Sequence, residues 1–431
     1  MKNSFTKKII SILIVLVISL SFISCQTAES SEPVSVEPTE DPYTYVEVLE
    51  LNTYNDFAID LLKSIRADMS AGDEGSASDA SGNVVVSPVN VGVALTMFSI
   101  GAVGTTKEGI QDALSLELGD AALLTSSAKN LMDSLSEKEG AQFANGYTLY
   151  INEGPTVRED FAVRMEDYFR LDLNFENFDE ERLEVHLNDW ASNLTNDSAP
   201  ITSIFSVNSL PHDTSTFMLS VSSVDCRWDT EFNLANTRTL PFTSDSGQAL
   251  AVPTMRGKMT IGFYENEDVT MGLFPLAGNT ITLAIFIPPD DDTLEKFLND
   301  FTGDDILKWQ LLAYEKEKWI YLPKINFSYP VVLELSGVLS QMGASDMFNS
   351  ETADFTNLGS DFYIDDFYAA SLIRITETGE NESDITPVDI TRANNNNEDF
   401  FIVDRSFVFA LLDNETGGIL TIGTLANPIE S

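Results

Sequence analysis

The spacing of apolar side chains predicts helices in the first part of the chain. Between residues 45 and 69 the large apolar side chains recur every three or four positions, which is typical of an amphipathic helix. Residues 84–86 are three consecutive valines and indicate a short buried strand. Ser87 and Pro88 follow, and they predict the start of a second helix, since serine is a favoured N-cap and proline fits the first helical turn.

Glycines mark the predicted end of this second helix. Gly101 and Gly104 lie where the apolar periodicity stops, and glycine commonly terminates helices. Thr105 and Glu108 then have the spacing of a capping box, in which each side chain bonds a free backbone N–H of the first turn. We therefore expect a third helix to begin at Thr105.

Extended segments dominate the second half of the chain. They comprise a continuous apolar run, an alternating run, a long strand and a terminal pair that flanks an Asp/Gly-rich turn: 280–287, 319–327, 362–375, 407–409 and 419–422. The terminal pair has the pattern of a β-hairpin. Because helices come early and strands late, the predicted class is α+β with large, mainly antiparallel sheets.

The first 24 residues are typical of a secretory leader. Three lysines and no acid precede an apolar run over 9–23, which is shorter than the about 20 residues that a membrane span needs. The run ends in Phe22-Ile23-Ser24-Cys25, which resembles the lipidation box of bacterial lipoproteins. We expect residues 1–24 to be a cleaved signal peptide and Cys25 to carry the lipid; an uncleaved anchor and ordinary secretion are the alternatives.

The remaining organisation follows from composition. Residues 25–45 are an acidic tether rich in Ser, Pro and Glu with no periodic apolar face, and residues 46–431 show no linker or repeat that would divide them. We therefore expect one domain outside the cytoplasm, in the periplasm or at the cell surface, held to the membrane through the lipid on Cys25.

Charge and cysteine content exclude several classes of function. The chain has 68 acidic and 24 basic residues, a net charge of −44, so charge-driven binding to nucleic acid or anionic lipid is not expected. Cys25 and Cys226 are the two cysteines. With Cys25 committed to lipid, no internal disulfide is expected, and Cys226, close to Trp228, is predicted to be a buried, small apolar residue.

The sequence offers little material for catalysis. The two histidines, His186 and His212, have no metal-site spacing, and no nucleophile elbow, phosphate loop or CxxC pattern occurs. A Ser-His-Asp set assembled from distant residues stays open as an alternative. Residues 290–292 are three consecutive aspartates. Such a cluster can bind a hard cation, but more commonly it is a solvated turn. We expect no enzyme, no metal and no cofactor.

Motifs along most of the chain resemble the serpin family. The stretch from Asn83 through Ser87-Pro88 to Gly101-Ala-Val-Gly104 is similar to the family's N-terminal signature. Further matches follow in serpin order: Asn188-x-Trp190, Trp228 with Phe232, Val252-Pro253-x-Met255, Leu322-Pro323-Lys324, Met342-Gly343, Asp346-Met-Phe348, Ala353-Asp354-Phe355, Phe407-x-Phe409, Asp413-x-x-Thr416-Gly417 and Asn427-Pro428. The agreement is collinear from about Phe57 to Pro428.

The resemblance implies a fold and a mechanism. It implies three sheets, about nine helices and an exposed reactive loop between a strand ending near Thr376 and one starting near Phe400. Inhibitory serpins offer this loop as a substrate, and after cleavage the loop inserts as a new central strand and drags the acylated protease with it. The implied function is a monomeric suicide-substrate inhibitor of extracellular serine or cysteine proteases, acting through residues 377–400.

The hinge of the loop departs from the family pattern. Three positions match it, namely Glu377, Gly379 and Thr386. The family's run of alanines is replaced, and acidic residues or proline stand at Glu380, Glu382, Asp384 and Pro387. In the family register the three acids face the core, where unpaired carboxylates are costly, and proline lacks a ladder hydrogen bond. Shifting the register by one residue turns Asn381, Ser383 and Ile385 inward instead.

Two further groups of residues follow from the resemblance. Ser87 is retained under the main sheet, but Asn90, Ser220 and Ala369 stand where the family has a second serine, an asparagine and a histidine, while Trp228 is kept where the sheet opens. The scissile bond falls at Ala393–Asn394, with Arg392 one residue away. Arg392 suits a trypsin-like pocket and Ala393 an elastase-like one; an ordinary solvated loop is the alternative.

Two functions of different kinds are compatible with these residues. The first is protease inhibition through the loop. The second is a non-inhibitory serpin-fold surface lipoprotein that acts as a binding protein, scaffold or plain protease substrate, for which the charged hinge is the main support. A hydrolase with an unrecognised site is a third, weakened by the scarcity of histidine.

Overall fold

The computed structural model describes residues 54–71, 82–115, 121–152, 154–175, 180–195, 199–205, 216–289, 292–377 and 399–428. The residues from Tyr45 to Ser431 form one compact unit. A second unit, Met1–Thr44, contains the predicted leader and most of the predicted tether and lies outside the described residues. Within the described residues, no helix combines the length and apolar character that crossing a bilayer requires.

Nine α-helices occur in the described part of the chain, in agreement with the predicted number. Their bounds are α2 Tyr54–Ala71, α3 Pro88–Gly101, α4 Gly104–Ala113, α5 Ala121–Ser136, α6 Glu159–Phe169, α7 Glu180–Thr195, α8 Leu294–Asp300, α9 Gly303–Leu312 and α10 Ser336–Leu339.

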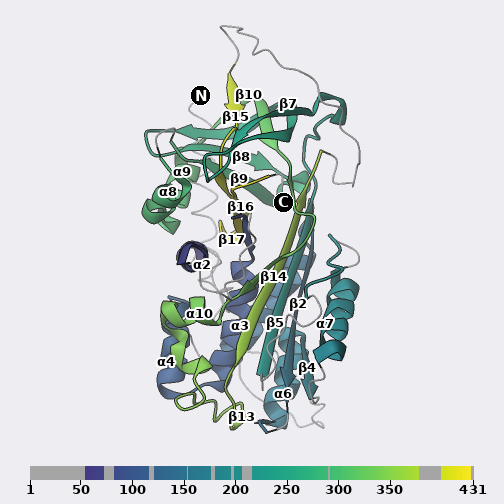
Figure 1. The fold of residues 1–431 in the computed structure, drawn as a ribbon, viewed down its shortest axis with the longest axis vertical. Coiled ribbons are helices and arrows are strands. Elements are labelled where there is room, and N and C mark those ends of the chain that lie inside the picture. Colours follow the sequence, from purple (N-terminus) through teal and green to yellow (C-terminus); the bar gives the residue numbers. More distant parts are fainter. Residues whose placement is uncertain are drawn as a thin grey trace, which may run out of the picture. The chain divides into compact units, whose positions relative to one another are not determined.

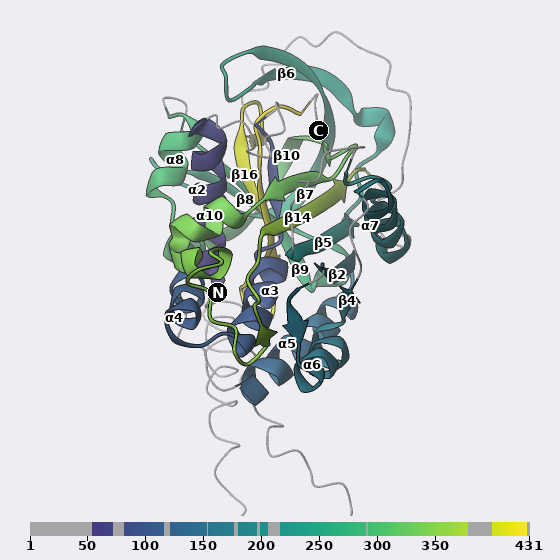
Figure 2. The same ribbon diagram turned by 60° about the horizontal axis from the view of Figure 1, so that its bottom comes forward.

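Three sheets account for the described strands, as predicted (Figures 1 and 2). The six-stranded sheet has the order β11-β14-β5-β2-β4, with β12 also paired to β14. Its strands are β2 Ala141–Ile151, β4 Leu171–Phe175, β5 Thr216–Cys226, β11 Ile325–Asn326, β12 Val331–Glu334 and β14 Asp366–Ile375. The smallest sheet pairs β3 Thr156–Val157 with β13 Gly359–Ser360.

The nine-stranded sheet has the order β1-β17-β16-β9-β8-β7-β10-β15, with β6 beside β7. Its strands are β1 Val84–Val86, β6 Arg238–Thr243, β7 Ala249–Glu265, β8 Thr270–Pro275, β9 Ile281–Ile287, β10 Tyr314–Pro323, β15 Phe400–Ile402, β16 Phe407–Asp413 and β17 Ile419–Leu425. Three strand pairings are parallel, β5 with β14, β2 with β4 and β10 with β15, and the others are antiparallel. The predicted α+β class with mainly antiparallel sheets is therefore confirmed.

Helix α3 lies in the core and contacts both β5 and β17, which belong to different sheets. All 14 of its residues are buried. The predicted start is confirmed: Ser87 is the N-cap, its hydroxyl accepts a hydrogen bond from the Asn90 amide, and Pro88 occupies the first turn. This helix forms the floor beneath the centre of the six-stranded sheet.

The capping-box prediction is wrong. Helix α4 begins at Gly104, its N-cap is Val103, and no side chain caps it. Tertiary contacts take the place of the local cap, because the Val103 amide donates to the carbonyl of Asp354 (2.9 Å) and the Thr106 hydroxyl accepts from the Asp354 amide (2.9 Å). A contact that distant in sequence leaves no local signal.

The predicted strands are confirmed with shifted ends. The long strand predicted from residue 362 begins at Asp366, and the alternating run over 319–327 is divided between β10 and β11. The terminal hairpin is present as β16 and β17.

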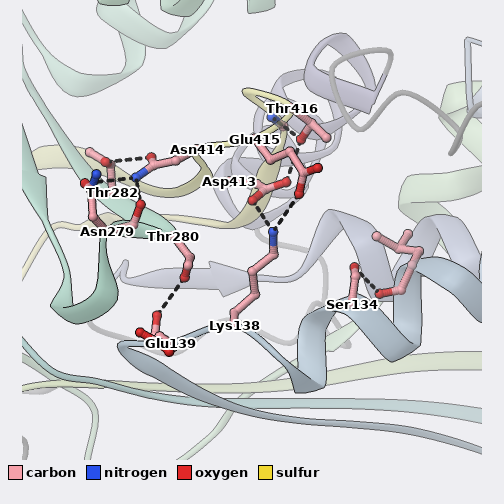
Figure 3. Close-up of polar contacts among 12 residues, drawn as sticks. Ser134, Lys138, Glu139, Asn279, Thr280, Thr282, Asp413, Asn414, Glu415 and Thr416 are labelled. Carbon is pink, nitrogen blue, oxygen red and sulfur yellow. Dashed lines mark hydrogen bonds and ion pairs between the residues drawn. The ribbon is translucent and has the colours of Figure 1, made fainter. Parts of the chain in front are cut away.

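A group of polar contacts fastens the segment before β2 to the hairpin turn (Figure 3). The Lys138 ammonium lies 2.5 Å from Asp413 Oδ1 and 3.9 Å from Glu415 Oε2, and the Asp413 side chain is 2% exposed. The Thr280 hydroxyl donates to the carbonyl of Glu139 (2.8 Å). One end of β2 is therefore held to the larger sheet.

Candidate functional site

The central feature of the six-stranded sheet is the boundary between β5 and β14, which we call the seam. The two strands run parallel and side by side (Figure 1). Ten residue pairs close the seam, from Asp366 with Phe217 at one end to Ile375 with Cys226 at the other. The predicted reactive loop begins immediately after the second end. Any strand added to the centre of this sheet would have to separate these ten pairs.

A buried ion pair lies where β14 ends and the loop begins. Glu377 is 2% exposed, and its carboxylate lies 2.8 Å from the ammonium of Lys324 and accepts a hydrogen bond from Thr237. Its carbonyl accepts a hydrogen bond from the amide of Phe232 (3.2 Å). Because a buried carboxylate is costly without partners, these contacts hold the first hinge residue in place.

Trp228 adds a second attachment at the same point. Its indole Nε1–H donates to the carbonyl of Thr376 (2.7 Å). The ring packs edge-to-face against Phe232 and Phe274, with centroid distances of 5.1 and 6.1 Å. Trp228 therefore lies at the end of the seam from which the predicted loop leaves. Lys324 belongs to a motif shared with the family, but its pairing with Glu377 was not predicted from the sequence.

Polar groups from α3 cross the middle of the site. The Ser87 hydroxyl donates to the carbonyl of Leu420 (3.0 Å). The Asn90 side chain donates to the carbonyl of Val221 in β5 (2.7 Å) and accepts from the Tyr147 hydroxyl (3.3 Å). Ser87 and Asn90 thus lie together beneath the sheet, and Tyr147 of β2 contacts Asn90. No spacing in the sequence indicates the role of Tyr147.

The two remaining positions under the sheet lie directly opposite each other. Ser220 and Ala369 are register partners across the seam, and each is 2% exposed. Alanine has no polar side-chain atom, so Ala369 contributes no hydrogen bond where the family has histidine. In this chain the polar contacts beneath the sheet instead centre on Asn90.

The far end of the loop is attached through a shorter strand pairing. Strand β15 pairs with β10 over three residues. Lys316 lies 2.8 Å from Asp399, and this ion pair lowers the pKa of the Asp399 carboxyl. The Lys318 ammonium lies 3.6 Å from the ring centroid of Phe263 and donates to the carbonyl of Phe400 (3.3 Å), while burial lowers its pKa.

Several predicted site residues lie outside the described residues. They are Cys25, Gly379, Glu380, Glu382, Asp384, Thr386, Pro387, Arg392, Ala393, Asn394 and His212. Of the other predicted residues, Cys226 is fully buried, as expected, and burial raises the pKa of its thiol.

Two of the residues considered for hydrolytic or metal chemistry, His186 and Asp292, lie among the described residues. His186 is exposed on α7 and makes an edge-to-face contact with Tyr150 at 5.9 Å. Asp292 pairs with Lys296 in an i,i+4 arrangement. No group of three or more potential metal-ligating side chains occurs in the part of the chain that the structure describes.

Comparison with known proteins identifies the fold and the family. A human protein, Serpin B13, is 22% identical over 371 residues, covering 80% of this chain and 94% of its own. An uncharacterized serpin-like protein of Thermococcus kodakarensis is 26% identical over 389 residues, covering 88% and 85% of the two chains. The native state of the thermophilic serpin tengpin superimposes with a TM-score of 0.75 at 23% identity, covering 89% and 95%.

The family profile described as Serpin (serine protease inhibitor) matches residues 52–428. This match spans nearly all of the compact unit, and it includes the closed seam, the Glu377 attachment and both ends of the loop. The chain therefore belongs to the serpin family.

Proposed function

We propose that this protein inhibits extracellular serine or cysteine proteases as a suicide substrate through residues 377–400. The observation that carries the proposal is the closed seam beside the start of the loop. All ten residues of β14 pair with β5, and the loop leaves at Glu377 and returns at β15. A protease that cleaves the loop would free its first half to enter the seam as an additional strand.

Insertion would be driven by the sheet itself. A strand between β5 and β14 gains hydrogen-bonded neighbours on both sides, antiparallel to each, whereas the two strands now form one parallel pairing. The cleaved form would therefore be more stable than the intact form. The acylated protease, carried on the end of the inserted segment, would be displaced along the sheet before it could hydrolyse its ester (serine protease) or thioester (cysteine protease) bond to the loop.

The sequence of the hinge favours a second candidate function. Glu380, Glu382 and Asp384 oppose burial, and Pro387 removes a ladder hydrogen bond. If insertion is slower than deacylation, the chain is a plain substrate or a non-inhibitory binding lipoprotein. Both candidates act without catalysis by this chain and need no cofactor.

A gel assay separates the two candidates. The chain is incubated with trypsin-like and elastase-like proteases, and SDS-stable complexes are compared with cleaved fragments. We expect cleavage between Asp389 and Asn397, with a minor fraction in complex. Replacing Glu380, Glu382 and Asp384 by Thr or Ala should raise that fraction, because the inserted face loses its carboxylates; the same holds for Pro387→Ala.

Glu398→Ala is the matched control for these substitutions. It removes a carboxylate of the same loop beyond the proposed scissile bond and should leave the complex fraction unchanged. If no variant forms complex with any protease tested, inhibition is refuted and the binding or scaffold function stands. Efficient one-to-one complex formation by the unmodified chain would instead refute the inference that the acidic hinge slows insertion.

The bait residues predict protease choice. Arg392→Gln should abolish trypsin-like cleavage and leave elastase-like cleavage after Ala393, because trypsin-like pockets require a basic side chain. Cleavage at the Ala393–Asn394 bond is identified by the masses of the two fragments. Trypsin-like cleavage that uses Arg392 falls at the Arg392–Ala393 bond. Trypsin-like cleavage of the loop that persists in Arg392→Gln would exclude Arg392 as bait.

We also propose that the inhibitor acts as a monomer anchored outside the cytoplasm by a lipid on Cys25. The basic and apolar leader before Ser24-Cys25 supports this. Cys25→Ser should release the protein from the membrane fraction. If the variant stays in that fraction with its leader uncleaved, the apolar segment itself is the anchor. The molar mass of the released protein, measured by light scattering, tests whether it is a monomer.

A further inference from the structure

An ion pair bridges the seam close to the end at which the loop begins. Arg374 of β14 and Asp225 of β5 are register partners, and their side chains form a salt bridge and hydrogen bond. The two side chains are 14% and 10% exposed. Each partner therefore lies on a strand that must move away from the other when the seam opens.

The opposite end of the seam is joined by aromatic rings on the same face. Side chains two residues apart on a strand share a face, which places Asp225 with Phe217 and Arg374 with Tyr368. Phe217 stacks on Tyr368 with centroids 5.3 Å apart. Phe205 contacts both rings, at 5.8 and 5.4 Å. Opening the seam at its aromatic end breaks ring contacts, whereas opening it at the loop-proximal end separates two charges.

The ion pair is not fully satisfied in the closed sheet. Asp225 Oδ1 and Arg374 Nε are buried and have no hydrogen-bond partner among the described residues. The bond to its partner is therefore the one hydrogen bond of each side chain among the described residues, in a mostly buried setting. Removing one partner leaves a poorly solvated charge in the closed state, while opening the seam gives that charge access to water. Loss of either partner should therefore favour the open seam.

We propose that Asp225 and Arg374 form a latch that sets how readily the seam opens at the loop-proximal end. This inference rests on the proposed function for its consequence: a weaker latch lets the cleaved loop insert sooner relative to deacylation. The latch itself is a property of the intact chain and is measurable without a protease. Asp225 and Arg374 are thus positioning residues for insertion.

The chain supplies its own probe of seam opening. Cys226 is adjacent to Asp225, it is the register partner of Ile375 across the seam, and it is fully buried while the seam is closed. In the full-length chain carrying Cys25→Ser, Cys226 is the sole thiol. Its labelling rate by a thiol reagent, measured well below the unfolding transition, reports opening at this end.

We expect Asp225→Asn and Arg374→Gln each to speed labelling of Cys226 at least about tenfold, the factor that corresponds to about 1.4 kcal/mol. The double variant should be no faster than the single ones, because the second substitution removes a charge that no longer has a partner. Exchanging the two residues, with Asp225→Arg and Arg374→Asp together, should slow labelling again. Glu317→Gln breaks the cross-strand pair with Lys258 on β7 and β10, away from the seam, and should change nothing.

The outcomes separate the latch from the proposed function. Unchanged labelling in the single variants, or additive effects in the double variant, would overturn the latch whatever the gel assay shows. The acceleration can be converted to a free energy and compared with the loss of global unfolding free energy in the same variant. If it is no larger than that loss, labelling follows global unfolding and the latch is overturned. Faster labelling without any protease complex would uphold the latch and refute inhibition. Faster labelling together with more complex supports both.

Discussion

Replacing Lys324 by Met tests the attachment of the hinge most directly. The substitution keeps an unbranched side chain of similar length and removes the ammonium that lies 2.8 Å from Glu377. Glu377 is 2% exposed and would retain the hydroxyl of Thr237 as its side-chain partner. The variant therefore leaves a buried carboxylate without its counter-charge.

The size of the effect follows from this geometry. At 2.8 Å and an effective dielectric of about 20, the attraction of the two charges is about 6 kcal/mol, before desolvation of both groups is subtracted. Truncating one partner of a buried pair costs about 3 to 5 kcal/mol, and the remaining bond from Thr237 favours the lower end. With an unfolding entropy of about 2.1 cal/mol/K per residue, a loss of about 3 kcal/mol lowers the thermal midpoint by about 4 °C.

Thermal and urea unfolding followed by tryptophan fluorescence measure this change. Trp228 donates to Thr376, the residue before Glu377, so its emission reports the same attachment. Lys258→Met is the control, because that ion pair is exposed and should contribute less than about 1 kcal/mol. A loss below about 1 kcal/mol in Lys324→Met as well would refute the inference that the pair holds the hinge.

Three other changes have defined outcomes. Asn90→Ala should destabilise by about 1 to 3 kcal/mol in urea unfolding, because the buried carbonyl of Val221 loses its donor. Gly140→Ala should destabilise by more than about 2 kcal/mol, since Gly140 has a φ of +83° and a Cβ there would lie 2.0 Å from the carbonyl oxygen of Ala277; Gly337→Ala, with open space around it, should be neutral or stabilising. The pKa of Lys318 is lower folded than unfolded, so the unfolded chain binds more protons and stability should rise with pH from that lowered value to about 10.4; Lys318→Met should abolish this rise in the urea midpoint measured at pH 7 and 9.5.

Local signals explain what the sequence could predict. The Ser87 N-cap, the terminal hairpin and the two ends of the loop are set by neighbouring residues or by family motifs, and all agree with the structure. The burial of Cys226 followed from its small apolar character and the absence of a partner cysteine.

Contacts between distant segments explain what the sequence could not predict. The ion pair of Arg374 with Asp225 joins two strands, and that of Lys324 with Glu377 joins two segments that lie just outside strands. In both cases the positions of the partners are set by the whole sheet. The prediction for the start of α4 was wrong for the same reason, because contact with Asp354 replaced the expected capping box. Composition indicates that such charges need partners but does not name them.

The position of the C-terminal strands has a consequence for any chain nicked in the loop. Strand β16 lies between β17 and β9, in the interior of the nine-stranded sheet, and all seven residues of β16 and all seven of β17 are buried. A cut at the proposed bait bond would leave these strands on the shorter fragment, with β15 still paired to β10. The two pieces would therefore remain one particle by size-exclusion chromatography and come apart only in denaturant, so proteolysis of this protein is invisible to any assay that measures native size.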